Sequence, residues 1–134
     1  MKNELKKAKA LRNYLGIKID EIKTDGEGFE IVGSSERYLI LSDQEANEAV
    51  RENIKENICY FNASFIARRS HLSKEVIEHL QEKHEEVNDL LIRELISFDR
   101  FVINAIEEDG RGHFLSSYDS DEHEAGDFYI YQID

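Results

Sequence analysis

The stretch YLILSDQEA, residues 38–46, decides the fold class because it changes from a strand pattern to a helix start within nine residues. Residues 38–41 are apolar at every position, which predicts a strand that is central in its sheet or covered on both faces. Ser42 and Glu45 then form a capping box, in which each side chain accepts a hydrogen bond from the other residue's backbone N–H. The sequence therefore predicts a buried strand followed directly by a helix.

Upstream of this stretch, the pattern predicts a basic helix and then short strands. Residues 3–15 place apolar side chains at helical spacing and stop at Gly16, a suitable position for a left-handed helix cap. Short apolar runs separated by glycine-rich turns predict three strands within residues 17–41.

Downstream, helical periodicity extends through residues 43–108. Residues 111–134 are expected to form an acidic hairpin, with strands near 113–116 and 128–133. The sequence contains no proline and no internal repeat, so nothing in it marks a domain boundary. We therefore predict a single α+β domain over residues 1–134, in which an antiparallel sheet of about five strands packs against three to five helices.

The charge of the chain excludes several classes of partner. The sequence has 29 acidic and 17 basic side chains, a formal net charge of -12 at pH 7. Such a charge repels phosphate backbones and anionic lipids, so we expect no direct nucleic-acid binding and no membrane binding. No apolar run is long enough to cross a bilayer and residues 1–9 lack a signal peptide's apolar stretch, which predicts a cytoplasmic location. Cys59 is the single cysteine, and a buried apolar role is its default.

Acidic side chains recur at helical spacing within residues 73–97, a helical pattern so long that the helix must span the domain, break or protrude. His84 falls on the apolar side of this helix, which predicts a buried histidine. Carboxylates about 5 to 6 Å apart resemble the phosphate spacing of a nucleic-acid strand and can occupy a basic groove built for nucleic acid. The alternative is a solvated face that only keeps the protein soluble. The candidate partner-binding residues are Glu75, Glu78, Glu82, Glu86 and Asp89 in the helix, and Asp119, Asp121, Glu122 and Glu124 in the hairpin.

Side chains able to carry chemistry are densest between residues 111 and 123. His113, Asp119 and His123 could hold a divalent metal ion, with Arg111 on a phosphate group, as in a small metal-dependent phosphoesterase or nucleotide hydrolase. Their spacing matches no metal-binding motif, however, and an exposed loop rich in turn-forming acids is the preferred interpretation. We therefore assign no catalytic residue, metal or cofactor from the sequence, and favour a binding protein over an enzyme.

Four stretches carry a resemblance to a known group of proteins. YLILSDQEA (38–46), FNASFI (61–66), GRGHFLSSYD (110–119) and DFYIYQI (127–133) resemble segments of small uncharacterised proteins from bacteriophages and related mobile elements. The stretches cover less than half of the chain, and Ser120 stands where the family pattern has glycine. The resemblance implies a phage-type origin, and it supplies no catalytic residues.

Phage genomes hold many small acidic proteins that block host machinery, and some of them imitate DNA. We therefore expect an accessory protein that binds a host protein with a basic surface, such as a nuclease or a CRISPR effector, in the cytoplasm of an infected or lysogenic bacterium. Two alternatives stay open. One is the phosphoesterase described above, and the other is a self-associating phage structural protein, because the apolar end of the predicted long helix could form a homodimer contact.

Overall fold

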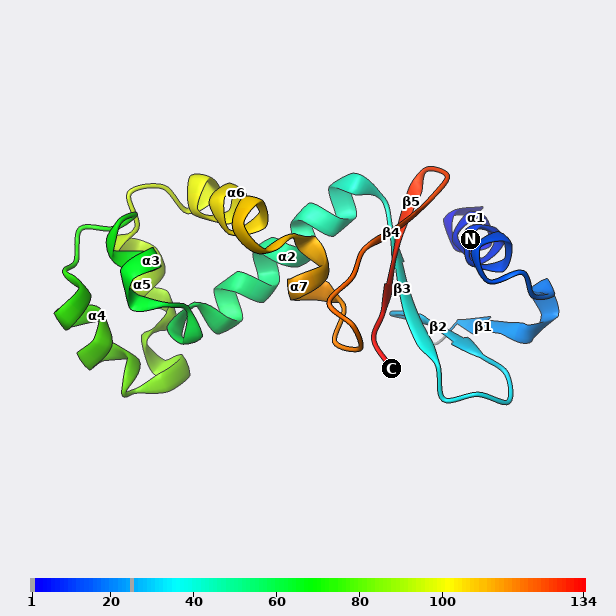
Figure 1. Ribbon diagram of the computed structural model, residues 1–134, viewed down its shortest axis with the longest axis horizontal. Helices are drawn as coiled ribbons and strands as arrows, with labels where there is room; N and C mark the ends of the chain where they lie inside the picture. Colours follow the sequence, from blue (N-terminus) through cyan, green and yellow to red (C-terminus); the bar gives the residue numbers. More distant parts are fainter. Residues whose placement is uncertain (1, 25) are drawn as a thin grey trace. The chain divides into compact units, whose positions relative to one another are not determined.

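The computed structural model describes residues 2–24 and 26–134, and these residues divide into two units (Figure 1). Unit 1 combines the N-terminal part of the chain, through Ala49, with Gly110–Asp134, and unit 2 is Val50–Asp109. Unit 1 is therefore discontinuous in sequence and holds the sheet, whereas unit 2 is helical. That the two units fold as a single domain stays a prediction.

In the described residues, unit 1 is built on a five-stranded antiparallel sheet with the strand order β1-β2-β3-β5-β4. The strands are β1 (Ile22–Thr24), β2 (Phe29–Ile31), β3 (Arg37–Leu41), β4 (His123–Ala125) and β5 (Phe128–Gln132). The middle strand is β3, as its run of apolar residues predicts. It pairs with β5 from the far end of the sequence, with Ile40 opposite Ile130. The predicted α+β class and the five-stranded antiparallel sheet are confirmed.

Helix α1 (Lys2–Leu15) packs against the sheet and closes the core of unit 1. Leu11 is fully buried against apolar side chains of β2, β3 and β5. The helix ends as predicted, because Gly16 adopts a φ of 69° and its N–H donates to Arg12 O at 2.8 Å. The next element is the 3-10 turn η1 (Ile19–Glu21), so the first strand begins at Ile22 rather than at residue 17, where the predicted strand region starts.

The segment expected as a strand at residues 113–116 is instead the short helix α7 (Arg111–Leu115), so the prediction of a hairpin over 111–134 is wrong in its first part. Gly110 has a φ of 81° and lets the chain turn into α7. Gly112 then packs so closely that an added Cβ would lie 2.5 Å from the Ser120 carbonyl oxygen. A run of five residues is too short for its periodicity to separate helix from strand, and these tertiary contacts decide the outcome. The hairpin itself is formed by β4 and β5.

Helix α2 (Asp43–Asn57) begins in unit 1 and ends in unit 2. Its predicted capping box is present, with the Glu45 N–H 3.2 Å from Ser42 Oγ and the Ser42 N–H 2.9 Å from Glu45 Oε1. The remaining elements of unit 2 are η2 (Ile58–Tyr60), α3 (Ala63–Ala67), α4 (Lys74–Gln81), η3 (His84–Val87), α5 (Asn88–Glu94) and α6 (Phe98–Asp109). Its fully buried side chains include Ile54, Ile66, Ile77, Leu91 and Phe101.

The helical segment over residues 73–97, for which the sequence leaves a break open, is broken, because α4 ends at Gln81 and α5 begins at Asn88. His84 lies at the break with a φ of 56°, and it is exposed rather than buried as predicted. Non-local contacts stabilise the break. The side chain of Asn88 accepts from the Cys59 N–H at 2.9 Å and donates to Glu56 O at 2.8 Å. These contacts join the start of α5 to η2 and to the last turn of α2.

Candidate functional site

The acidic side chains of α4 share one face of the helix. Ser73 caps its N-terminus, because Ser73 Oγ accepts a hydrogen bond from a first-turn backbone N–H at 3.3 Å. Ile77 is fully buried, which fixes the inner side of α4. Glu75, Glu78 and Glu82 follow at steps of three and four residues on the opposite side, and all three are exposed. We call these three residues the α4 face.

Within the described residues, no lysine or arginine forms a salt bridge with the α4 face. Glu82 lies 3.4 Å from His79, and both side chains are more than two-thirds exposed to solvent. Glu78 and Glu82 are like charges one turn apart, and Glu82 stands at the carboxyl end of the helix, where the helix dipole disfavours an anion. These charges therefore work against the stability of α4 and are open to a cation from outside.

The other two acids of the predicted ridge do not continue the α4 face. Glu86 lies in η3 and Asp89 lies in the first turn of α5, beyond the break at His84. Both side chains are exposed. The acids of residues 75–89 therefore lie on separate elements, and the role of Glu86 and Asp89 in binding stays a prediction.

Arg111 is held by three side chains of unit 1. Its Nε donates to Glu122 Oε1 at 2.7 Å, and its Nη1 donates to Asp43 Oδ1 at 2.9 Å and to Asn47 Oδ1 at 3.1 Å. The guanidinium carbon lies 4.5 Å from the centre of the Tyr129 ring, and only 9% of the side chain is exposed. Burial opposes its charge, but the hydrogen bonds to Glu122 and Asp43 outweigh burial and raise the pKa of Arg111.

This arrangement makes Arg111 a cross-link between α7, the start of α2 and the loop before β4. Glu122 is committed to the same cross-link, since it also accepts a hydrogen bond from the hydroxyl of the buried Tyr131. The geometry thus favours a structural role for Arg111 over the phosphate contact considered from the sequence. Because Glu122 takes part in the cross-link, it is less available to a partner than the exposed Asp121 and Glu124.

The loop after α7 brings together two of the predicted metal-ligating residues and adds a third. Ligand atoms of Asp119, Asp121 and His123 all lie within 4.8 Å of one another. Ser116 Oγ lies 2.7 Å from Asp119 Oδ1, and the Asp121 N–H donates to the same oxygen at 3.0 Å. These two contacts lower the pKa of Asp119, so the carboxylate is ionised at neutral pH. Carboxylate oxygens and an imidazole nitrogen suit Mn²⁺ or Zn²⁺.

His113 is not part of this group. It is exposed on α7, where its ring meets that of Phe114 edge-on at 5.0 Å. The four residues considered for catalysis from the sequence therefore separate into three sets: Asp119 with His123, Arg111 in its cross-link, and His113 by itself.

Cys59 is buried, as predicted, with 2% of its surface exposed. Burial, with the nearby Glu85 charge, raises the pKa of its thiol, so the sulfur is protonated at neutral pH. It is therefore a packing residue rather than a nucleophile.

Asp43 and Asn47 are the site residues that sequence reasoning missed. They contact Arg111 from more than sixty positions away in the sequence, and no local sequence pattern predicts such a contact. Asp121 alternates with Asp119 and His123 in the sequence, and the ligand atoms of all three lie together.

Among the described residues, no helix has the length and apolar character needed to cross a membrane. Comparison with known proteins gives no match to this chain, neither to a protein family, nor to a curated protein, nor to a solved structure.

Proposed function

We propose that this protein acts by binding a basic surface of a host protein through the α4 face. The observation that carries the proposal is the set of three exposed carboxylates on one helix face, none of which forms a salt bridge with a lysine or arginine of the described residues. Glu75, Glu78 and Glu82 follow at axial steps of about 4.5 and 6 Å, close to the spacing of phosphates along a nucleic-acid strand. A basic groove that binds nucleic acid therefore suits this face.

The charge around α4 supports the same proposal. Residues 74–94 contain seven acids and three bases, so the field around unit 2 attracts cations well beyond the three contact residues. Electrostatic complementarity of this kind speeds association and selects partners by charge. With the resemblance of the sequence to phage proteins, it points to an accessory protein that occupies the nucleic-acid site of a host defence enzyme, such as a nuclease or a CRISPR effector.

The test compares two variants with the same change in net charge. The face variant carries Glu75→Gln, Glu78→Gln and Glu82→Gln, and the control carries Glu107→Gln, Glu108→Gln and Asp109→Asn at the exposed end of α6. Proteins retained from a bacterial lysate by the natural sequence are purified and titrated calorimetrically with all three forms. Three ion pairs at about 0.2 to 1 kcal/mol each predict a loss of roughly tenfold in affinity for the face variant and little change for the control.

Equal weakening by the two variants would show that net charge alone matters, and unchanged affinity of the face variant would remove the proposal. Circular dichroism of each variant checks the fold, since glutamine and glutamate have similar helix propensities.

A metal-dependent phosphoesterase is the second candidate, favoured by the convergence of Asp119, Asp121 and His123. These residues would hold the metal ion, which would supply an activated water. A rise in melting temperature with Mn²⁺ or Zn²⁺ that is lost in His123→Ala is expected on this account, because a ligand that binds only the folded state stabilises it. No rise would dispose of this candidate.

A further inference from the structure

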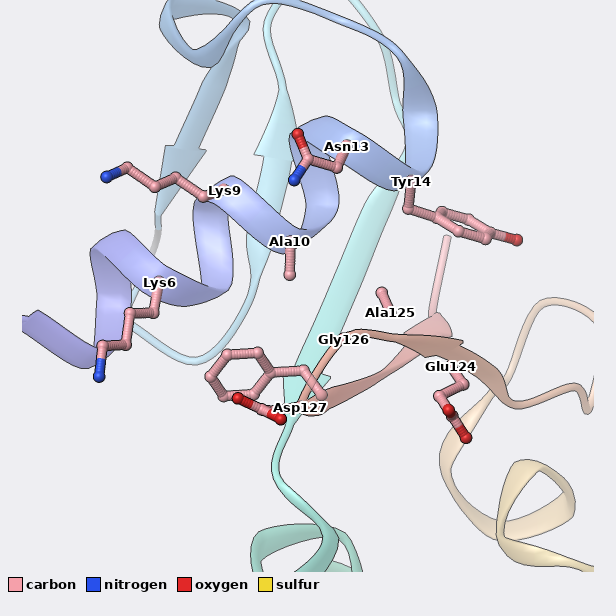
Figure 2. A pocket seen from close by; sticks show the side chains of 10 residues that line it. Lys6, Lys9, Ala10, Asn13, Tyr14, Glu124, Ala125, Gly126 and Asp127 are labelled. Carbon is pink, nitrogen blue, oxygen red and sulfur yellow. The ribbon is translucent and has the colours of Figure 1, made fainter.

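A groove of about 500 Å³ lies within unit 1, between α1 and the β4–β5 hairpin (Figure 2). It shares no residue with the α4 face, so a ligand of the groove is independent of the proposed function. The volume falls in the range of small-molecule sites in proteins, roughly 300 to 1,000 Å³. The lining residues that matter most for a ligand are Lys6, Lys9, Ala10, Tyr14, Glu124 and Phe128.

One wall of the groove is a single face of α1. Lys6, Ala10 and Tyr14 stand one helical turn apart, and Lys9 lies beside Ala10 on the same wall. The eight residue steps from Lys6 to Tyr14, at about 1.5 Å each, give this wall a length of about 12 Å. The other wall is the hairpin, with Glu124 on β4 and Phe128 at the start of β5.

The two ends of the groove differ in chemistry. Figure 2 shows Lys6 and Lys9 projecting at one end, with Tyr14 and Glu124 at the other and Ala10 facing the hairpin between them. Both lysines and Glu124 are exposed, and Phe128 is half-buried. Asp127 of the hairpin also lines the groove and is exposed. In the described part of the chain no salt bridge joins these lysines to Glu124 or Asp127, so the charged side chains can meet a ligand.

Contacts with neighbouring residues determine which side chains are available at each end of the groove. Lys7 is not available to a ligand, because its Nζ lies 3.0 Å from Glu45 and its side chain is only 14% exposed. The Tyr14 ring packs against His123 with a centroid distance of 5.3 Å, which restrains it at the edge of the groove while 43% of the residue stays exposed.

A ligand that uses the whole groove has an anionic end, a flat apolar middle and a hydrogen-bond donor at the far end. A purely apolar molecule would leave the lysines and Glu124 without partners, and a simple anion would use only the lysine end. The geometry points to a nucleoside monophosphate, with its phosphate on Lys6 and Lys9, its base along Phe128 and Tyr14, and an exocyclic amine donating to Glu124.

The negative charge of the whole chain does not oppose such a ligand at close range. Residues 1–18 hold six bases and one acid, so the local field at α1 is positive. Charges farther away than about 8 Å are largely screened at physiological ionic strength. The distant acids therefore contribute little, and within the groove the ammonium groups of Lys6 and Lys9 are balanced by the carboxylates of Glu124 and Asp127.

The experiment is an NMR chemical-shift titration of the isotopically labelled chain with adenosine monophosphate, adenosine and inorganic phosphate. We expect the nucleotide to shift resonances of α1 and the hairpin, with an affinity at least tenfold higher than that of either fragment. The variant Lys6→Gln/Lys9→Gln and the variant Tyr14→Ala should each weaken nucleotide binding by about tenfold or less, since exposed contacts are individually modest. Lys23→Gln, an exposed lysine on β1 of the same unit, should leave it unchanged.

Three results would overturn the inference. One is the absence of shifts at millimolar nucleotide. A second is equal binding of phosphate and nucleotide, which would mean a simple lysine patch. The third is equal affinity of the natural sequence and the Lys6→Gln/Lys9→Gln variant. The dispersion of resonances in each variant reports directly that unit 1 is folded.

Discussion

Replacing Arg111 by glutamine tests whether this side chain holds unit 1 together or is available to a phosphate. The three contacts counted here are the 2.7 Å hydrogen bond to Glu122, the 2.9 Å hydrogen bond to Asp43 and the stacking over Tyr129, and the 3.1 Å hydrogen bond to Asn47 is lost with them. Glu122 is 30% exposed, and its charge-assisted bond to a side chain only 9% exposed should contribute about 1.5 kcal/mol. Asp43 is 72% exposed and contributes about 0.5 kcal/mol.

The stacking over Tyr129 adds about 0.5 kcal/mol, so Arg111→Gln should lower the free energy of unfolding by roughly 2.5 kcal/mol. For a chain of 134 residues this corresponds to a fall in melting temperature of roughly 8 °C. Thermal and urea unfolding followed by circular dichroism measure it. The exposed Arg68 provides a matched control, since Arg68→Gln should change stability by less than about 0.5 kcal/mol.

A double-mutant cycle with Glu122→Gln separates the interaction between Arg111 and Glu122 from the other contacts of Arg111. The expected coupling energy is about 1 to 2 kcal/mol. The reasoning is refuted if Arg111→Gln is as stable as the natural sequence. It is also refuted if phosphate stabilises the natural sequence but not this variant, because the guanidinium would then be a ligand site rather than a cross-link.

Three further changes test other parts of the structure. Asn88→Ala leaves the buried Cys59 N–H without its partner and should cost about 2 to 4 kcal/mol in urea unfolding; a loss below 1 kcal/mol would contradict the account of the helix break. Gly112→Ala puts a Cβ 2.5 Å from the Ser120 carbonyl oxygen, so the loop must move, and we expect about 1 to 3 kcal/mol of destabilisation with NMR shifts in residues 119–123. Burial disfavours the ionised form of Glu45, but hydrogen bonds from Ser42 and Lys7 outweigh burial and lower the pKa of Glu45 below 4.5. The stabilisation from ionised Glu45 is therefore present above pH 4.5 and is lost as the pH falls through the folded-state pKa. Glu45→Gln should therefore flatten the stability profile between about pH 5 and pH 3, and an unchanged profile would contradict this role.

Local signals predicted the elements that depend on local contacts. The capping box at Ser42 and Glu45 sets the start of α2 because both hydrogen bonds lie within four residues. The apolar run at 38–41 predicted the central strand, since only a strand covered by its neighbours tolerates apolar side chains at every position. The α4 face was predicted for the same reason, because Ser73, Ile77 and the three acids form one local helical pattern.

Non-local contacts account for what sequence reasoning missed. The periodicity of residues 73–97 continues through the break, whereas the hydrogen bonds of Asn88 with Glu56 and Cys59 that accompany the break are non-local. Helix α7 depends on Gly112 packing against a loop that comes after it in sequence. The partners of Arg111 come from the start of α2, so the sequence could nominate this arginine but could not reveal what it binds.

The α4 face is tested most directly by competition at a partner's nucleic-acid site. A fluorescently labelled DNA duplex is bound to the host protein retained from lysate, and its anisotropy is followed as this protein is added. The natural sequence and the Glu107/Glu108/Asp109 control variant should release the duplex at similar concentrations, and the Glu75/Glu78/Glu82 variant should need roughly ten times more. Release of the duplex by the Glu75/Glu78/Glu82 variant at the same concentration as the natural sequence, or no release by the natural sequence, would contradict the account.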